Sequence, residues 1–168
     1  MFHLLKIENI KHLDVDGTIL WQQNDIYNIF HSNGQQYLLN VMFNTSSGIT
    51  IPSNYYLGLD NRTTSSIGDT LASLSNEPTQ NGYLRQAVSS LNGFSVALGT
   101  DNTNYQATSN IAVFNATGGQ WGPVSNLFLA TTLTNTGYLI STAVLTSPVT
   151  VSSGQQVSMR ISVGLINC

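Results

Sequence analysis

The fold class is decided by the stretch Val157-Ser158-Met159-Arg160-Ile161-Ser162-Val163-Gly164-Leu165. Apolar residues alternate strictly with polar or small ones along it. Successive side chains of a β-strand point to opposite faces of its sheet, so the five apolar residues would all lie on one face. The period of two therefore predicts a β-strand with one buried face.

Seven more stretches upstream show strand-like patterns and are separated by Gly and Asn turns. They lie at residues 55–59, 82–88, 94–98, 111–113, 124–131, 138–144 and 149–151. No helical period separates them, although a parallel α/β fold would require helices between its strands. The chain is therefore predicted to be all-β, with an antiparallel β-sandwich or jelly-roll-like body over residues 51–168.

A short helical segment is predicted near residues 26–43, within a helical connector that spans residues 24–50. Its apolar residues follow helical spacing in two groups, which are Ile26, Ile29 and Phe30, then Tyr37, Leu38, Val41 and Met42. Ser32-Asn33-Gly34 separates the groups, and Ser32 or Asn33 could cap the second helix. We expect the apolar face of this segment to plug one end of the β core.

The first 23 residues differ in composition from the rest and are predicted to form an extended N-terminal arm, with one short strand at residues 18–21. Charged residues crowd its beginning, whereas large apolar residues recur along its whole length. The apolar residues are Phe2, Leu4, Leu5, Ile7, Ile10, Leu13 and Trp21. An exposed apolar strip of this kind implies a partner surface, so we expect these seven residues to form an interface.

The scarcity of charge argues against catalysis. Charged residues make up 8% of the chain, against about 25% in ordinary globular domains. Arg160 is the only charged residue after Asp101, whereas enzymes depend on ionisable groups placed at a site. We therefore expect no enzyme and no cofactor. A soluble secreted β-domain is the plainest alternative to a protein built into a larger assembly.

Charge and cysteine content also limit the partners. The net charge is −3, with two lysines and three arginines, which argues against a nucleic-acid footprint. No apolar run approaches the ~20 residues of a membrane span, so no membrane partner is expected. Cys168 is the only cysteine, and the fold therefore does not depend on an intrachain disulfide.

Two candidate catalytic or metal motifs have simpler interpretations. Asp14-Val15-Asp16-Gly17-Thr18 matches the D-x-D-G-T signature of haloacid-dehalogenase-type phosphatases, but no lysine follows Lys11 and no adjacent acidic pair occurs. We therefore interpret the motif as an Asp-Gly turn before a short strand. His3, His12 and His31 have no compact metal-site spacing, and we interpret them as surface or interface residues.

The charged residues of the body lie close together in the sequence. They are Asp60, Arg62, Asp69, Glu77 and Arg85. We predict structural ion pairing among them, with Arg85 in mid-strand tethering the 60–80 loop through a carboxylate. The alternative is a sugar-binding site in which Tyr55, Tyr56 and Tyr83 provide stacking surfaces.

Three stretches together resemble a group of virion structural proteins of tailed bacteriophages, over about residues 40–168. The first is Tyr55-Tyr56-Leu57-Gly58-Leu59-Asp60-Asn61-Arg62. The second comprises residues 68–74, Glu77-Pro78 and Gly82-Tyr83-Leu84-Arg85-Gln86. The third comprises residues 121–130 and Thr136-Gly137-Tyr138-Leu139-Ile140. The resemblance implies a β-rich virion component and carries over no catalytic residue.

These observations lead us to expect a capsid cement or decoration protein that stabilises the phage head through its arm. Its expected partners are the major capsid protein or other virion proteins, and further copies of itself in a homo-oligomer. Its expected location is the capsid surface of the virion, after assembly in the host cytoplasm. The alternatives are a neck or tail-fibre component of the virion and a carbohydrate-binding adhesin domain.

Overall fold

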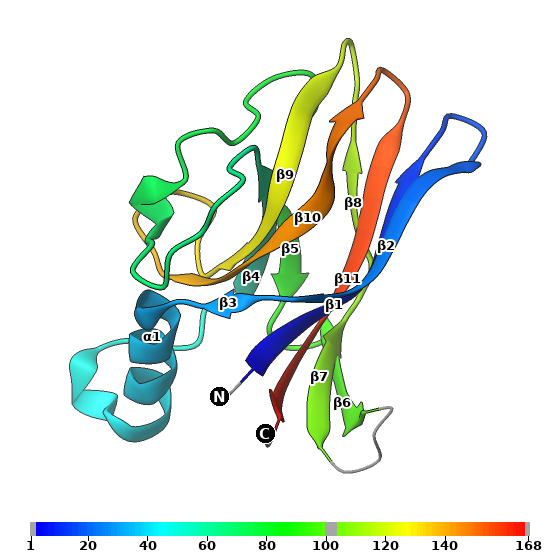
Figure 1. Ribbon diagram of the computed structural model, residues 1–168. Coiled ribbons are helices and arrows are strands. Elements are labelled where there is room, and N and C mark those ends of the chain that lie inside the picture. Colours follow the sequence, from blue (N-terminus) through cyan, green and yellow to red (C-terminus); the bar gives the residue numbers. More distant parts are fainter. Residues whose placement is uncertain (1–2, 100–103, 167–168) are drawn as a thin grey trace.

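The computed structural model describes residues 3–99 and 104–166, which form two antiparallel sheets packed face to face (Figure 1). The first sheet contains β1 (His3–Leu13), β2 (Ile19–Tyr27), β6 (Phe94–Leu98), β7 (Tyr105–Ser109), β8 (Ala112–Asn115) and β11 (Gln156–Ile166). The second contains β3 (Ile29–Phe30), β4 (Asn54–Asp60), β5 (Gln86–Ser89), β9 (Trp121–Ala130) and β10 (Leu139–Val151). The predicted all-β sandwich is confirmed.

Strand β11 organises the first sheet. One edge of β11 pairs with β1, and its other edge pairs with β8 near its start and with β7 farther along. β2 and β6 are the outermost strands of this sheet among the described residues. The side chains of Val157, Met159 and Ile161 are buried in the core, as their alternation predicts, whereas Arg160 is exposed on the outer face. The side chain of Leu165 lies outside the described residues.

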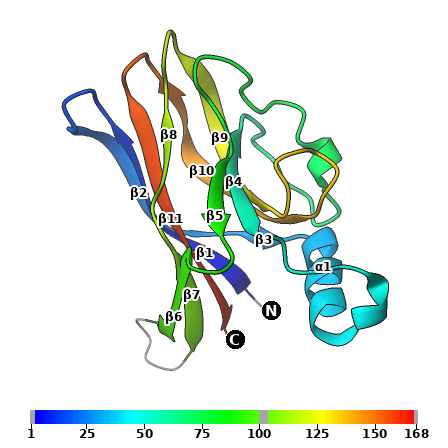
Figure 2. The same cartoon turned by 180° about the vertical axis from the view of Figure 1, so that it is seen from behind.

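Strand β9 is covered on both of its faces. Leu127 and Leu129 face the main core between the sheets, whereas Phe128 and Ala130 pack on the other side against Leu71. The covering segment is the loop of residues 61–80, which contains the 3-10 helix Leu71–Ser73. Figure 2 shows this loop, in green, over β4 and β9. The continuous burial of residues 124–131 follows from this double packing.

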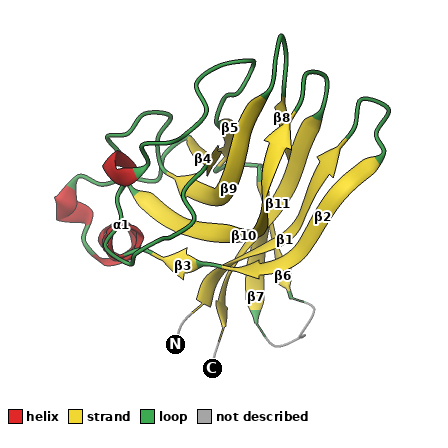
Figure 3. Cartoon of the chain, turned by 45° about the horizontal axis from the view of Figure 1, so that its top comes forward, coloured by secondary structure: helices red, strands yellow, loops and turns green. Residues whose placement is uncertain are grey.

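The predicted helical connector contains one α-helix, α1 (Ser32–Phe43), followed by the 3-10 helix Thr45–Ser47 (Figure 3). The helix that we predicted over residues 26–30 is wrong, because these residues end β2 and form β3. The predicted caps also differ, since His31 is the N-cap and Asn33 instead accepts a hydrogen bond from the backbone N–H of Leu139. None of the described helices is long and apolar enough to cross a membrane.

Helix α1 packs against strand β10 at one end of the sandwich, where the sequence predicts a helix (Figure 1). Gly34 lies so close to strand β10 that an added Cβ would be 2.5 Å from the carbonyl oxygen of Ile140. Tyr37, one turn later, is buried in the main core. The absence of a side chain at Gly34 therefore lets the helix pack directly on the second sheet.

The predicted arm is different in the structure. Residues 3–13 form β1, which pairs with β11 along its whole length and with β2 on its other edge. Ile10 is fully buried in the main core. The segment looks separate in the sequence because its partner strand β11 lies more than a hundred residues away.

Candidate functional site

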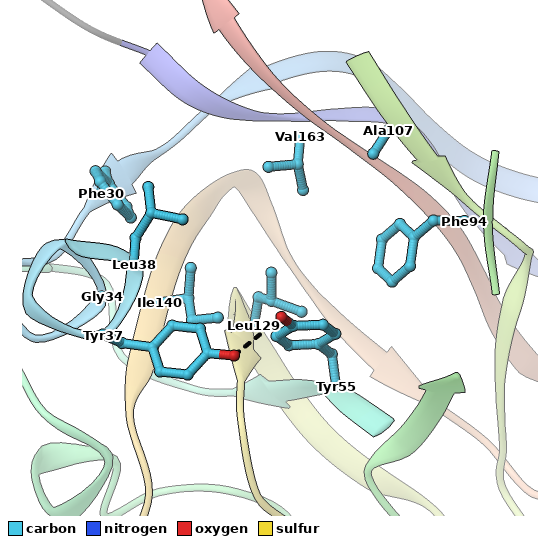
Figure 4. A pocket seen from close by; sticks show the side chains of 10 residues that line it. All are labelled: Phe30, Gly34, Tyr37, Leu38, Tyr55, Phe94, Ala107, Leu129, Ile140 and Val163. Carbon is cyan, nitrogen blue, oxygen red and sulfur yellow. Dashed lines mark hydrogen bonds between the residues drawn. The ribbon is translucent and has the colours of Figure 1, made fainter. Parts of the chain in front are cut away.

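An apolar recess lies between the sheets beside α1, with a volume of about 270 Å³. Figure 4 shows that side chains from both sheets and from the helix meet there. The first sheet contributes Phe94, Ala107 and Val163; the second contributes Phe30, Tyr55, Leu129 and Ile140; and α1 contributes Gly34, Tyr37 and Leu38. None of these residues is charged, so the pocket suits an apolar group.

Two tyrosine hydroxyls supply the polar atoms of this pocket. The Oη atoms of Tyr37 and Tyr55 lie 3.0 Å apart and share a hydrogen bond (Figure 4). Their rings meet edge to face, and Tyr55 meets Phe94 in the same way. Burial raises the pKa of Tyr37, and its bond with Tyr55 raises it further. The Tyr37 hydroxyl is therefore a neutral hydrogen-bonding group near pH 7.

The structure brings the five predicted ion-pairing residues together in two groups around the 61–80 loop. In the first, the guanidinium of Arg62 lies 3.0 Å from a carboxylate oxygen of Asp60 and 3.1 Å from one of Asp69. Asp60 is fully buried at the end of β4. Burial raises the pKa of Asp60, and the adjacent Arg62 opposes that rise. Arg62 thus fastens the start of the loop to the second sheet.

Arg85 forms the second group. Its guanidinium binds the Glu77 carboxylate in a forked arrangement, with the closest N···O distance at 2.7 Å. It also donates to the backbone carbonyls of Thr132 and Thr134 and lies over the Phe128 ring, 5.0 Å from its centroid. Arg85 lies just before β5 and not in mid-strand as predicted. It ties the end of the loop to the β9–β10 turn.

The predicted sugar-stacking tyrosines are not exposed as a group. Tyr83 is buried between the rings of Phe114 and Trp121. Its hydroxyl accepts a hydrogen bond from the Leu59 N–H and bonds to Glu77, and burial raises its pKa. Tyr55 is half-buried in the pocket. Tyr83 is therefore a core residue and not a surface for a sugar ring.

Two of the three histidines are buried, whereas we predicted surface or interface residues. His31 is fully buried, and its Nε2 lies 2.9 Å from the Thr142 hydroxyl. Burial lowers the pKa of His31. His12 is buried too, and its Nε2 lies 3.0 Å from the side-chain oxygen of Gln155. The side chain of His3 lies outside the described residues.

The Asp-Gly motif is the turn of the β1–β2 hairpin. The Asp14 carboxylate accepts the Val15 N–H, and the Asp16 carboxylate accepts the Thr18 N–H. The bond from Thr18 lowers the pKa of Asp16, and Gly17 has a φ of 85°. Both carboxylates thus stabilise a turn. Within residues 3–99 and 104–166, no three acidic, histidine or cysteine side chains group as metal ligands.

The seven predicted interface residues of the N-terminal segment have different surroundings. Ile10 is buried in the core, and Leu13 and Trp21 are half-buried. Leu4, Leu5 and Ile7 belong to β1, but only their backbone is described. Phe2 lies outside the described residues. Ile10, at least, is a core residue of this chain and is not available to a partner.

Comparison with known protein families gives a match to the family described as podophage GP4 fiber I protein gp80, over residues 30–166. The matched region includes α1, both ion-pair groups and all strands from β4 to β11. No curated protein matches the chain.

Proposed function

This chain belongs to the family of the podophage GP4 fiber I protein gp80, and from that membership we propose that it is a fibre component of the neck or tail of a phage particle. At the broader level it is a structural protein of a bacteriophage virion. The observation that carries the finer proposal is the family match, which spans most of the chain and names a fibre.

The chemistry of the described side chains supports a structural role without catalysis. Asp60, Asp69 and Glu77 are each engaged by an arginine, and Asp14 and Asp16 stabilise a turn. A general acid or base must be able to reach a substrate with a proton to exchange. These carboxylates instead hold loops in place, which suits a protein that acts through its surface.

A capsid cement remains the rival function, but its main support was a free apolar arm. Residues 3–13 pair within the first sheet, so they cannot reach a neighbouring capsid subunit without dismantling that sheet. Among the described side chains, α1, β6 and β7 carry six exposed large apolar residues, which are Leu39, Met42, Phe43, Val96, Leu98 and Tyr105. A fibre component that binds through these elements is consistent with both observations.

Locating the protein on the particle tests the proposal. Antibodies raised against the purified chain would be used to label intact virions for electron microscopy, with virions lacking the gene as the control. We expect a few labels per particle at the neck or tail. Dense labelling over the whole head would contradict the fibre proposal and favour a cement protein.

A further inference from the structure

The core-facing side of the first sheet extends beyond the second sheet near β6 and β7. By register, Val96 lies opposite Ala107 and Leu98 lies opposite Tyr105. Phe94 and Ala107 line the pocket, and because residues two apart share a face, Val96, Leu98 and Tyr105 continue that face. Their exposed fractions are 71%, 47% and 67%. We call these three residues the β6–β7 face. They lie on the side of the first sheet that elsewhere packs into the core, but here they are exposed to solvent beside the pocket.

A second apolar surface lies on the outer side of α1. Leu39, Met42 and Phe43 are spaced so that they share one side of the helix, with exposed fractions of 57%, 59% and 75%. We call them the α1 ridge. Gly34 and Tyr37 occupy the opposite, buried side of the same helix. The α1 ridge therefore points away from its own sandwich, and only another molecule can cover it.

We propose that the α1 ridge of one copy packs against the β6–β7 face of a second copy of this chain. The two surfaces occur once each on every chain, and all six of their residues are uncharged. One surface is a convex helix side, and the other borders a recess. Pairing them removes both from water, which is the main favourable term in protein association.

The pocket provides a place for the most exposed residue of the α1 ridge. A cavity of about 150 Å³ holds a benzene molecule, and this pocket has about 270 Å³. The phenyl ring of Phe43 from a neighbouring copy therefore fits in it, against Phe94 and Tyr55. Buried aromatic anchors of this kind commonly dominate the binding energy of an interface.

Such a contact joins two different surfaces, so each bound copy still presents one free α1 ridge and one free β6–β7 face. Contacts of this head-to-tail type produce closed rings or open filaments, depending on the rotation between copies. The inference rests on the geometry of the two surfaces and not on the position of the protein in the virion. It would hold equally for a fibre and for another virion component.

Complementation between two variants tests the contact. Phe43→Asp disables the α1 ridge, and Val96→Asp disables the β6–β7 face, because each would bury an unpaired charge in the contact. By light scattering after gel filtration, we expect the wild type to form oligomers, of one fixed size if the contact closes a ring and growing with concentration if it does not, and each variant to be monomeric. An equimolar mixture of the two should form a 1:1 dimer and nothing larger, since it retains one intact surface of each kind.

Val15→Asp is the matched control, because Val15 is also exposed and lies in the β1–β2 hairpin at the other end of the molecule (Figure 1). It should assemble like the wild type. Circular dichroism melts confirm that each variant is folded, and Phe43→Ser with Val96→Ser replaces any variant that is not. A wild type that stays monomeric into the millimolar range would overturn the proposal, as would variants that assemble normally or a mixture that stays monomeric. Antibody labelling of virions tests the fibre role separately.

Discussion

The loop side of the molecule and its helix end use their side chains in opposite ways. On the loop side, residues 61–85 cover the outer face of β9, and two arginines pair with three carboxylates there. At the helix end, the α1 ridge and the β6–β7 face leave six apolar side chains exposed, and none of them is charged. The loop side is therefore covered by contacts within the chain, whereas the helix end leaves apolar side chains exposed to solvent.

This difference shows where the few charges of the chain are used. Buried ion pairs contribute little net stability compared with apolar packing, but breaking one of them is costly. Charges therefore fix the loop in one position without favouring any partner. The open end has the composition expected of an interface core, which is depleted in charged residues.

The largest effect should come from removing the strand on which the open end depends. A chain of residues 24–168 lacks β1, which pairs with β11, the strand next to β7. We expect this truncation to lose cooperative unfolding altogether, since it removes the buried Ile10 and exposes an edge of β11. Thermal melts followed by circular dichroism would show this, and a truncated chain that melts like the full chain would mean that residues 1–23 are an arm.

Arg85→Ala should strongly weaken the loop side. The substitution leaves Glu77 half-buried without its cation, and breaking such pairs costs about 3–5 kcal/mol. Urea unfolding measures the loss of free energy. Arg160→Ala is the control, because Arg160 is exposed on the outer face of the first sheet, and such surface changes stay within about 0.5 kcal/mol. Equal effects of the two substitutions would remove the distinction between the closed loop side and the rest of the surface.

His31 joins the two regions and should make stability depend on pH. It precedes α1 and faces Thr142, the backbone of Ser66 and Ile67, and the charges of Asp69 and Arg62. Because its folded pKa is lowered, the unfolded chain binds more protons below the ordinary pKa of about 6.5. Stability from this group is thus present above that pH and is lost as the pH falls below it.

The corresponding measurement compares urea unfolding of the wild type and His31→Gln between about pH 7.5 and 5. The free energy of unfolding should fall more steeply with acidification in the wild type than in the variant. Parallel curves would show that burial of His31 does not couple the two regions to pH.

The smallest effect on folding should come from the open end. Leu39→Ser and Leu98→Ser each remove an exposed apolar side chain, and we expect the free energy of unfolding at low protein concentration to change by no more than about 0.5 kcal/mol. The same substitutions should weaken self-association. If either substitution strongly lowered the free energy of unfolding of the dilute monomer, the replaced side chain would belong to the core and not to an exposed surface.

The parts of the fold that the sequence predicts are those with a strict local period. β11 and most strands of the body belong to this group, because alternation over a few residues requires no knowledge of the partner. β1 does not, because its pairing with β11 is non-local and its apolar residues also suit an arm; the end of β2 does not, because its apolar spacing also suits a helix. β7 was missed because Tyr105 to Ser109 has only one large apolar residue.

Of the candidate sites, the sequence predicted the ion-pairing residues but not the pocket or the exposed side of α1. So few charges exist that five of them within 26 residues suggested mutual pairing, although the partner of each depends on the path of the loop. The pocket left no local signal, because its lining comes from seven separate strands and one helix. The exposed α1 ridge resembles a buried helix face in the sequence, and only the packing of Gly34 and Tyr37 shows which side is free.

The double covering of β9 has a consequence for how the molecule opens. β9 is hydrogen-bonded to β10 on one edge and to β4 on the other, and both faces are packed. Amides in such a strand exchange with solvent deuterium only through near-global opening, whereas exposed elements exchange by local fluctuation. If copies associate as proposed, the amides of β9 should therefore keep the same slow exchange with and without a neighbour, and only amides near the α1 ridge and the β6–β7 face should become more protected.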